Sequence, residues 1–276
     1  MRLDYFTLLS PKPISLSIGT IKQPTLNDIG DLTFEKFRIY QVYLKLTPSD
    51  YYTKINVEDG KIQWDTLSDE LKNDCSIYDV LLIQKDVQQV YLDLLNFFFK
   101  ERVVFMDNLF VLIKTDDYLT PPDELEINDD DICGVIHSEN FLDVLDILQQ
   151  VCCIKSDDPL DVVKPKFKNA KAKMLYDKML KAREAEKKKE DMKNLYNFTL
   201  PNIISATAAK TPGLNIINIW DATLFQLYDQ FGKIQNDDVH YINSVRVAVW
   251  GDEKNQFDPA LWYKNNFNKQ SLKDAP

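Results

Sequence analysis

A strongly basic segment between Lys164 and Lys193 is the feature that most constrains the fold. These thirty residues contain twelve Lys or Arg and five Asp or Glu, a net charge of +7, whereas the whole chain carries −10. No Gly or Pro follows Pro165 within the segment, and its Lys, Ala, Glu and Met content favours helix. We therefore predict one long helix that separates two packed parts of an otherwise acidic protein.

The apolar stripe of this helix fades along its length. Its first half carries Phe167, Ala170, Met174, Leu175, Met179 and Ala182 at helical spacing, whereas the stripe between Arg183 and Asp191 contains only Ala185. A helix without an apolar face stands in solvent and links packed parts. The sequence thus predicts an N-terminal α+β domain at 1–160, a long basic linking helix at 161–197 and a C-terminal helical domain at 198–276. The expected fold class is α+β, mainly α-helical, with small N-terminal β-hairpins.

Several short elements are expected in the first part. Ile14, Leu16 and Ile18 alternate with small residues, which indicates a hairpin strand with one buried face. Thr25 stands three residues before Asp28, an arrangement typical of a helix N-cap. A second helix is predicted from about Thr33 to Leu46. Residues 50–64 are expected to form a loop or a weak hairpin.

The strongest periodic pattern of this part follows two short helices, predicted at 66–73 and 76–82. An amphipathic helix is indicated by the apolar positions Val87, Val90, Tyr91, Leu94, Leu95 and Phe98. Next, a tight turn at Asp107-Asn108 predicts a β-hairpin of Arg102–Met106 and Leu109–Lys114. The acidic stretch 116–131 reads as a loop. A helix beginning near Ser138 follows, with Ser138 or Asn140 as cap.

The C-terminal part is predicted to be helical. A short helix is expected at 202–209, and an amphipathic helix is indicated by Trp220, Leu224, Leu227, Tyr228, Phe231 and Ile234. The pattern of residues 239–250 does not decide between strand and helix. Val245, Val247 and Val249 alternate as in a strand, whereas Ile242, Val245 and Val249 have helical spacing. A last helical turn is expected from Asp258-Pro259 through Tyr263.

Motifs for catalysis and for metal binding are not found. The seven Gly residues never come within ten positions of each other, which excludes a dinucleotide fingerprint and a P-loop. The run Asp129–Gly134 resembles the start of a calcium loop but has Cys133 at position 5 and Asn140 at position 12. His137 and His240 are the only histidines, and we expect ordinary structural or surface roles for both. We therefore expect a protein that is not an enzyme and has no cofactor and no metal site.

Composition also limits the partners and the compartment. No apolar run approaches the length of about 18 residues that a membrane span needs, and the chain starts without a secretion-signal pattern. The spacing of the four Cys suggests no disulfide framework, so reduced thiols in a cytoplasm are expected. A single Arg in the basic segment and a pI of about 4.8 argue against nucleic acid as the partner.

Several motifs resemble a family of proteins encoded by tailed bacteriophages and prophages of Gram-positive bacteria. The resemblance spans roughly residues 10–235, and its motifs are Ile18–Ile29, Asn140-Phe141, the Lys-rich segment, Leu200–Ala206 and Asn218–Phe231. Members are encoded near the tape-measure gene and are usually regarded as tail assembly chaperones. The family pattern carries no catalytic residues.

The resemblance implies a binding function in the cytoplasm of the bacterial host. A chaperone of this kind would cover the amphipathic helices of the tape-measure protein, or of another tail protein, with apolar surface of its own. The candidate contact residues are Trp220, Leu224, Leu227, Tyr228 and Phe231, with Lys187, Lys188 and Lys189 of the basic segment. The alternatives are a structural virion subunit of neck, tail or baseplate, and a nucleic-acid-binding accessory factor. Self-association is a further partner alternative.

Overall fold

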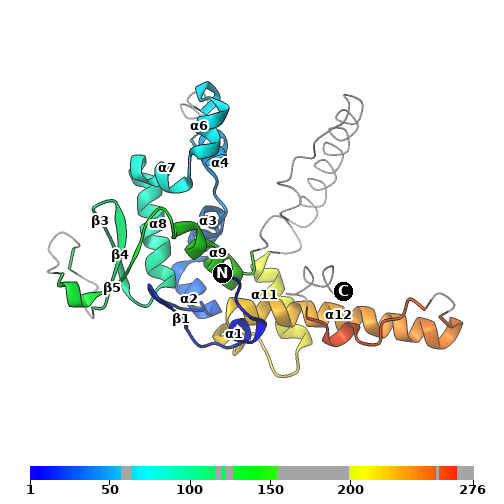
Figure 1. Ribbon diagram of the computed structural model, residues 1–276. Helices are drawn as coiled ribbons and strands as arrows, with labels where there is room; N and C mark the ends of the chain where they lie inside the picture. The colour runs from blue at the N-terminus through cyan, green and yellow to red at the C-terminus, as the bar shows by residue number, and fades with distance from the viewer. Residues whose placement is uncertain (57–63, 116–119, 122–126, 155–198, 253–254, 266–276) are drawn as a thin grey trace, which may run out of the picture. The chain divides into compact units, whose positions relative to one another are not determined.

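The computed structural model describes residues 1–56, 64–115, 120–121, 127–154, 199–252 and 255–265 (Figure 1). The fold is mainly helical α+β with two small antiparallel sheets, which confirms the predicted class. The chain divides into two compact units, residues 1–155 with 222–225 and residues 156–221 with 226–276. The long basic helix expected at 161–197 lies outside the described residues, and so do Lys187, Lys188 and Lys189.

The first unit combines short helices with both sheets. Its elements in chain order are α1 (Tyr5–Leu9), β1 (Ile14–Leu16), β2 (Gly19–Ile21), α2 (Leu26–Leu32), α3 (Phe34–Leu44), α4 (Pro48–Asp50), the π-helix η1 (Tyr51–Ile55), α6 (Asp69–Asp74), α7 (Ile77–Ile83), α8 (Lys85–Phe98), β3 (Arg102–Met106), β4 (Leu109–Ile113), the short helix η2 (Asp129–Asp131), β5 (Ile132–Ile136) and α9 (Phe141–Val151). The second unit contains α11 (Leu200–Lys210), η4 (Ile219–Asp221), most of α12 (Leu224–Trp250) and η5 (Leu261–Tyr263).

The N-terminal hairpin and the helix after it form as predicted. β1 pairs with β2 in antiparallel register, with Ile14 opposite Ile21, while Ile18 lies in the turn between the strands. Thr25 caps α2 by accepting a hydrogen bond from the Asp28 backbone N–H, and the Asp28 carboxylate accepts the Thr25 N–H in return. This reciprocal capping box satisfies two backbone donors that a helix start leaves unpaired.

One expectation for the first unit is wrong. A loop or weak hairpin was expected at residues 50–64, but α4 and η1 make residues 48–55 helical, with Pro48 at the first turn of α4. Residues 57–63 lie outside the described residues. Thr47 caps this start through its hydroxyl, which accepts the Asp50 N–H at 3.1 Å. The first helical residue has no partner for its N–H within the helix, so a proline, which lacks this group, fits there. Pro48 therefore begins α4.

The three-stranded sheet contains the predicted hairpin and one strand that the sequence did not reveal. β3 and β4 join through Asp107 and Asn108, both with positive φ, as a tight two-residue turn requires. β5 pairs antiparallel with the outer edge of β4, with Gly134 opposite Leu112. The acidic run before β5 and its Gly134 concealed this strand, because acids and Gly are depleted in strands.

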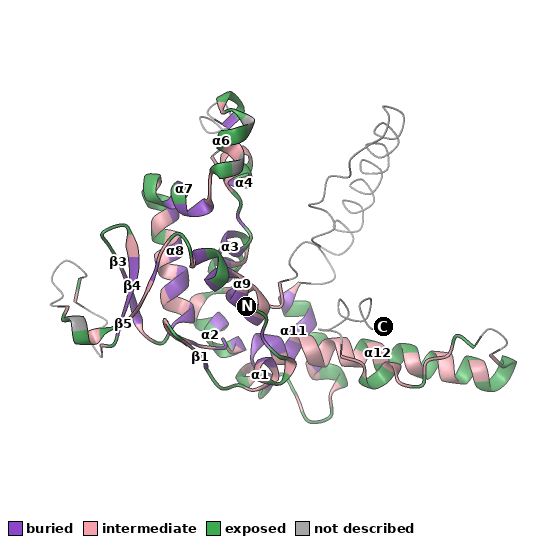
Figure 2. Cartoon of the chain, viewed as in Figure 1, coloured by how far each residue is buried: buried purple, intermediate pink, exposed green. Residues whose placement is uncertain are grey.

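An aromatic cluster fills the core of the first unit, between the sheet and the helices. The Phe141 ring of α9 lies 5.2 Å from the Tyr78 ring, 5.1 Å from the Tyr91 ring and 6.1 Å from the Phe110 ring. The hydroxyl of Tyr91 donates to the Tyr43 carbonyl at 2.9 Å, and burial raises the pKa of Tyr91, which therefore stays a donor. The buried residues of α8 all belong to its predicted apolar stripe, of which Val90 alone is only half-buried. Figure 2 shows buried positions along both α8 and α9.

Residues 222–225 complete the first unit although they follow it by more than sixty positions. The Leu26 N–H donates to the Ala222 carbonyl and the Leu224 N–H donates to the Pro24 carbonyl, both at 3.0 Å. Phe225 packs edge-on against Tyr5 at 6.1 Å. Thr223 and Thr25 thus form an isolated antiparallel β-bridge.

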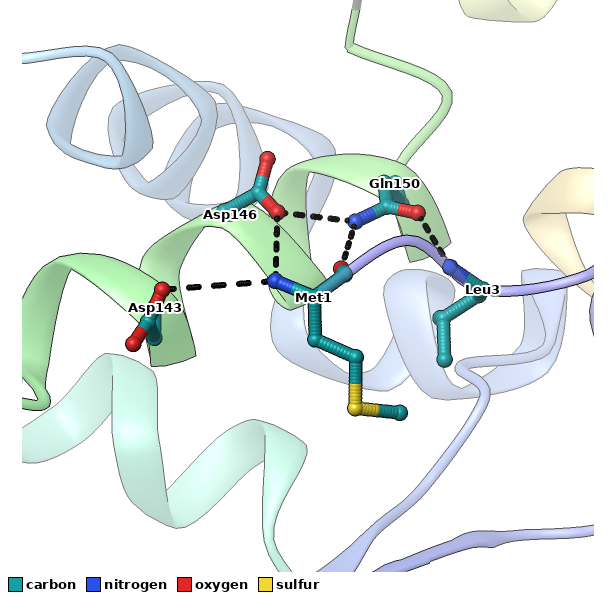
Figure 3. Close-up of polar contacts among 5 residues, drawn as sticks. All are labelled: Met1, Leu3, Asp143, Asp146 and Gln150. Atoms are coloured by element: carbon teal, nitrogen blue, oxygen red, sulfur yellow. Dashed lines mark hydrogen bonds and ion pairs between the residues drawn. The ribbon is translucent and has the colours of Figure 1, made fainter.

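The first residues of the chain are held against α9 (Figure 3). The Gln150 side chain accepts the Leu3 N–H at 2.8 Å and donates to the Met1 carbonyl at 2.8 Å. The Met1 amine lies 3.6 Å from the Asp146 carboxylate and 4.0 Å from that of Asp143. These contacts, together with the burial of Leu3, fix the N-terminal segment on the helix.

A buried amide holds the segment that follows. Gln23 Nε2 lies 2.9 Å from the Thr7 carbonyl, 2.6 Å from that of Ser10 and 2.9 Å from that of Lys12. One side chain thereby contacts a carbonyl within α1 and two carbonyls on the connection between α1 and β1. Because Gln23 is only 5% exposed, water does not readily replace it.

We expect Gln23→Met to lower the free energy of unfolding by about 1–3 kcal/mol, because the carbonyls lose a buried donor while the side-chain length is kept. Urea unfolding followed by far-UV circular dichroism measures the change. The same substitution at exposed Gln235 is the control and should shift stability by less than about 0.5 kcal/mol. Equal losses of stability in the two variants would show that the hydrogen bonds of Gln23 do not stabilise the fold.

Candidate functional site

An exposed apolar surface of the second unit lies on α12. This helix spans 27 residues, about 40 Å at 1.5 Å per residue. Its first turn is buried through Leu224, Phe225 and Leu227, whereas its last third is largely exposed (Figure 2). Residues 239–250, which the sequence left open between strand and helix, are helical to Trp250.

Four apolar side chains form a stripe on this exposed part. They are Tyr241, Ile242, Val245 and Val249, here named the α12 stripe, with exposed fractions of 68%, 65%, 47% and 64%. Their spacing of i, i+1, i+4 and i+8 places them on one side of the helix. Exposed apolar side chains that line one helix face are typical of a surface that binds a partner helix.

The stripe continues the face of α12 that contacts α11 earlier in the helix, at Asp238. Lys210, the last residue of α11, forms an ion pair with Asp238 of α12. Positions 242, 245 and 249 follow Asp238 at i+4, i+7 and i+11, so they share its side of the helix. α11 spans only 11 residues, about 16 Å, and α12 extends past its end. The stripe is thus the part of this face beyond the Lys210–Asp238 contact.

The chain after α12 turns back along a different side of the helix. The Asp252 carboxylate accepts the Gln256 and Phe257 N–H groups at 2.9 and 2.8 Å, which fixes the turn. The Phe257 ring then lies 5.4 Å from the His240 ring. Further on, Lys233 Nζ donates to the Tyr263 carbonyl at 2.9 Å. The return segment therefore runs antiparallel to α12 and covers the side of Lys233 and His240, leaving the α12 stripe exposed.

The contact residues predicted from the sequence are spread over different environments. Trp220 is not on α12 as expected but in η4, where its indole N–H donates to the Ile216 carbonyl at 2.8 Å. Leu224 and Leu227 are buried, which makes them packing residues. Tyr228 and Phe231 are half-buried. The α12 stripe was missed as a site, although the helical spacing of Ile242, Val245 and Val249 was its signal.

Metal-binding groups and cysteine thiols are two features that could give the described residues a chemical function. Among these residues no group of three or more His, Cys, Asp or Glu side chains could hold a metal ion. Burial raises the pKa of the Cys152 thiol well above its usual value, so this thiol stays protonated and unreactive. Burial likewise raises the pKa of Cys75. In the described part of the chain, no helix has the length and apolar content to span a membrane.

Comparison with known proteins relates the region of the α12 stripe to phages. Residues 185–266, less than a third of the chain, match the model of a family described as the YomV second domain, a phage-associated family. No curated protein and no solved structure matches the chain. The matched region contains α11, η4, α12 and η5. The match agrees with the phage relationship expected from the sequence motifs and indicates a phage protein.

Proposed function

We propose that this chain is a non-enzymatic phage tail morphogenesis protein, a tail assembly chaperone that binds the tape-measure protein in the host cytoplasm. The observation that carries the proposal is the α12 stripe, an exposed apolar helix face within the region that matches a phage-associated domain. A tape-measure protein is a long helical chain with amphipathic stripes, which need cover before the tail tube assembles. A partner helix that packs on the α12 stripe would provide this cover.

Charge supports the same function. The whole chain carries −10, so a complex that hides apolar helix faces would remain soluble through repulsion between like charges. The stripe itself is poor in charge, as the centre of a protein interface generally is. Apolar contact would thus supply affinity, and the acidic surroundings would limit further association.

We expect the double variant Ile242→Glu/Val245→Glu to lose the tape-measure complex. Each Glu would place a charge in the desolvated centre of the interface, a cost of about 2 kcal/mol or more that weakens binding at least about 30-fold. The readout is co-purification after co-expression with the tape-measure protein of the genome that encodes this chain. Glu is a good helix former, so α12 itself should persist.

A matched control is available on α3. Ile39 and Val42 have the same residue types and spacing as Ile242 and Val245, and their exposed fractions are 49% and 55%. Ile39→Glu/Val42→Glu should bind the tape-measure protein like the unmodified chain. Equal binding of the tape-measure protein by both double variants would show that the α12 stripe is not part of the interface. A tape-measure protein that stays insoluble with every form of the chain would refute the chaperone function itself.

Mass spectrometry of purified virions addresses the main alternative. A chaperone should be absent from particles or present in trace amounts, because it leaves as the tube assembles. Stoichiometric copies in the particle would instead identify a structural subunit of neck, tail or baseplate.

A further inference from the structure

The first unit contains a basic hollow that the proposed function does not use. Its volume is about 440 Å³, and its lining includes Lys22, Asp93, Asn96, Phe99, Lys100 and Arg102. Lys22 directly follows β2, Asp93 and Asn96 belong to α8, and Arg102 begins β3. Three cationic side chains from two segments, Lys22 after β2 and Lys100 with Arg102 at the start of β3, thus line one hollow of an acidic protein.

Backbone pairing fixes the walls of this hollow. The Lys22 N–H donates to the Phe98 carbonyl at 2.6 Å, and the Lys100 N–H donates to the Thr20 carbonyl at 2.9 Å. On the other wall, the Asn96 side chain accepts the Val103 N–H at 2.9 Å and donates to the Val103 carbonyl at 2.8 Å. The positions from which the cationic side chains extend are therefore set before any ligand arrives.

The carboxylates around the hollow are engaged by other groups. Asp93 accepts hydrogen bonds from Lys36 at 3.0 Å and from Gln89 at 2.8 Å. Glu101 accepts the Thr20 N–H at 2.8 Å. Asp28 belongs to the capping box of α2. Asp93 is the carboxylate among the lining residues, and its charge is balanced by the ion pair with Lys36, so the three cations of the lining leave the hollow with a net positive charge.

Two of the three cations of the hollow, Arg102 and Lys22, are partly or largely removed from water. Arg102 is only 7% exposed, and one of its nitrogens donates to the Thr120 carbonyl. Burial lowers the pKa of Lys22; the Asp28 carboxylate partly opposes this effect, and the nearby charge of Lys100 adds to it. Like charges held together with little water are stabilised by an anion placed between them.

We propose that the basic hollow binds a phosphate group, either free phosphate or the phosphate of a small organic ester. Ammonium and guanidinium groups form short, charge-assisted hydrogen bonds with phosphate oxygens. The volume of the hollow falls within the range of about 300–1,000 Å³ that small-molecule sites occupy. Leu92 of α8, a half-buried apolar residue of the lining, offers a surface against which the organic part of an ester can pack.

Isothermal titration of the full chain with two probes, inorganic phosphate and a nucleoside monophosphate, tests this site at constant ionic strength. Saturable binding is expected, and Lys22→Met/Lys100→Met should weaken it at least about tenfold by removing two charged donors. Tighter binding of the nucleotide than of phosphate identifies an organic ester as the ligand class, whereas equal binding identifies the phosphate group alone.

Lys45→Met/Lys85→Met is the control, because it removes the same charge from two exposed lysines outside the hollow. This pair should bind both probes like the unmodified chain. The single variant Lys100→Met alters an exposed side chain and keeps the test valid if the loss of half-buried Lys22 disturbs folding. Equal weakening by both lysine pairs, or no saturable binding of either probe, overturns the proposal.

Discussion

Phe141→Ala is expected to destabilise the protein by about 3–5 kcal/mol, the range found when a buried Phe is truncated in a packed core. The Phe141 side chain is fully buried, and its ring contacts the rings of Tyr78, Tyr91 and Phe110. Truncation would leave a cavity bounded by these rings. Because they come from α7, α8 and β4, the loss affects the contact of the sheet with the helices.

Leu142→Ala is the matched control for this prediction. Leu142 is the next residue of α9 and is 59% exposed, so its truncation should change stability by less than about 0.5 kcal/mol. Urea unfolding followed by far-UV circular dichroism measures both variants. A loss below about 1 kcal/mol for Phe141→Ala would show that the aromatic cluster does not control the stability of the first unit.

Gly134→Ala should be the second strongly destabilising change, with a loss of about 3 kcal/mol from overpacking. A Cβ at Gly134 would lie 2.4 Å from the Ile18 carbonyl oxygen and 2.5 Å from its Cα. Both are backbone atoms of the β1–β2 turn, which cannot move aside like a flexible side chain. Either β5 must shift from β4 or the hairpin turn must shift from the sheet.

Gly30→Ala provides the opposite outcome with the same chemical change. Gly30 lies in α2, and a Cβ there has no neighbouring atom within 4 Å. Replacement by Ala should raise stability by about 0.5–1 kcal/mol, because Ala loses less backbone entropy in a helix. Thermal and urea unfolding of the two variants should therefore change in opposite directions. A Gly134→Ala protein as stable as the unmodified chain would contradict the close backbone approach.

Elements determined by local patterns were predictable from the sequence. The stripe of α8, the cap at Thr25 and the turn at Asp107-Asn108 each depend on residues a few positions apart, and all three form as expected. β5 was missed because its place in the sheet depends on pairing with β4, whose partner residues lie about twenty positions away.

Trp220 illustrates how a distant pairing overrides a local period. Its spacing to Leu224 and Leu227 suits one helix, yet α12 begins only at Leu224. Thr223 forms a bridge with Thr25, and the Ala222 carbonyl and the Leu224 N–H bond to the N-terminal segment. Extended backbone is needed for this pairing, so a helix starting at Trp220 is excluded.

The candidate surfaces were harder to predict than the elements. The apolar period of Ile242, Val245 and Val249 was visible, but which face of a helix stays exposed depends on the return segment and on α11. The basic hollow combines Lys22 with Asp93, Lys100 and Arg102, which lie some seventy to eighty positions later in the sequence. Only the pairing of β2 with residues 98–100 brings them together.

The pairing of residues 222–225 with the chain at Pro24–Leu26 restricts how the gene can be divided. A fragment ending at residue 155 would lack buried Leu224 and Phe225, which belong to its own packed unit. A fragment of residues 185–266 would carry these two apolar side chains without the surface that buries them. The two units are therefore interleaved along the chain, and exchange between genomes at a single crossover would separate residues that fold together.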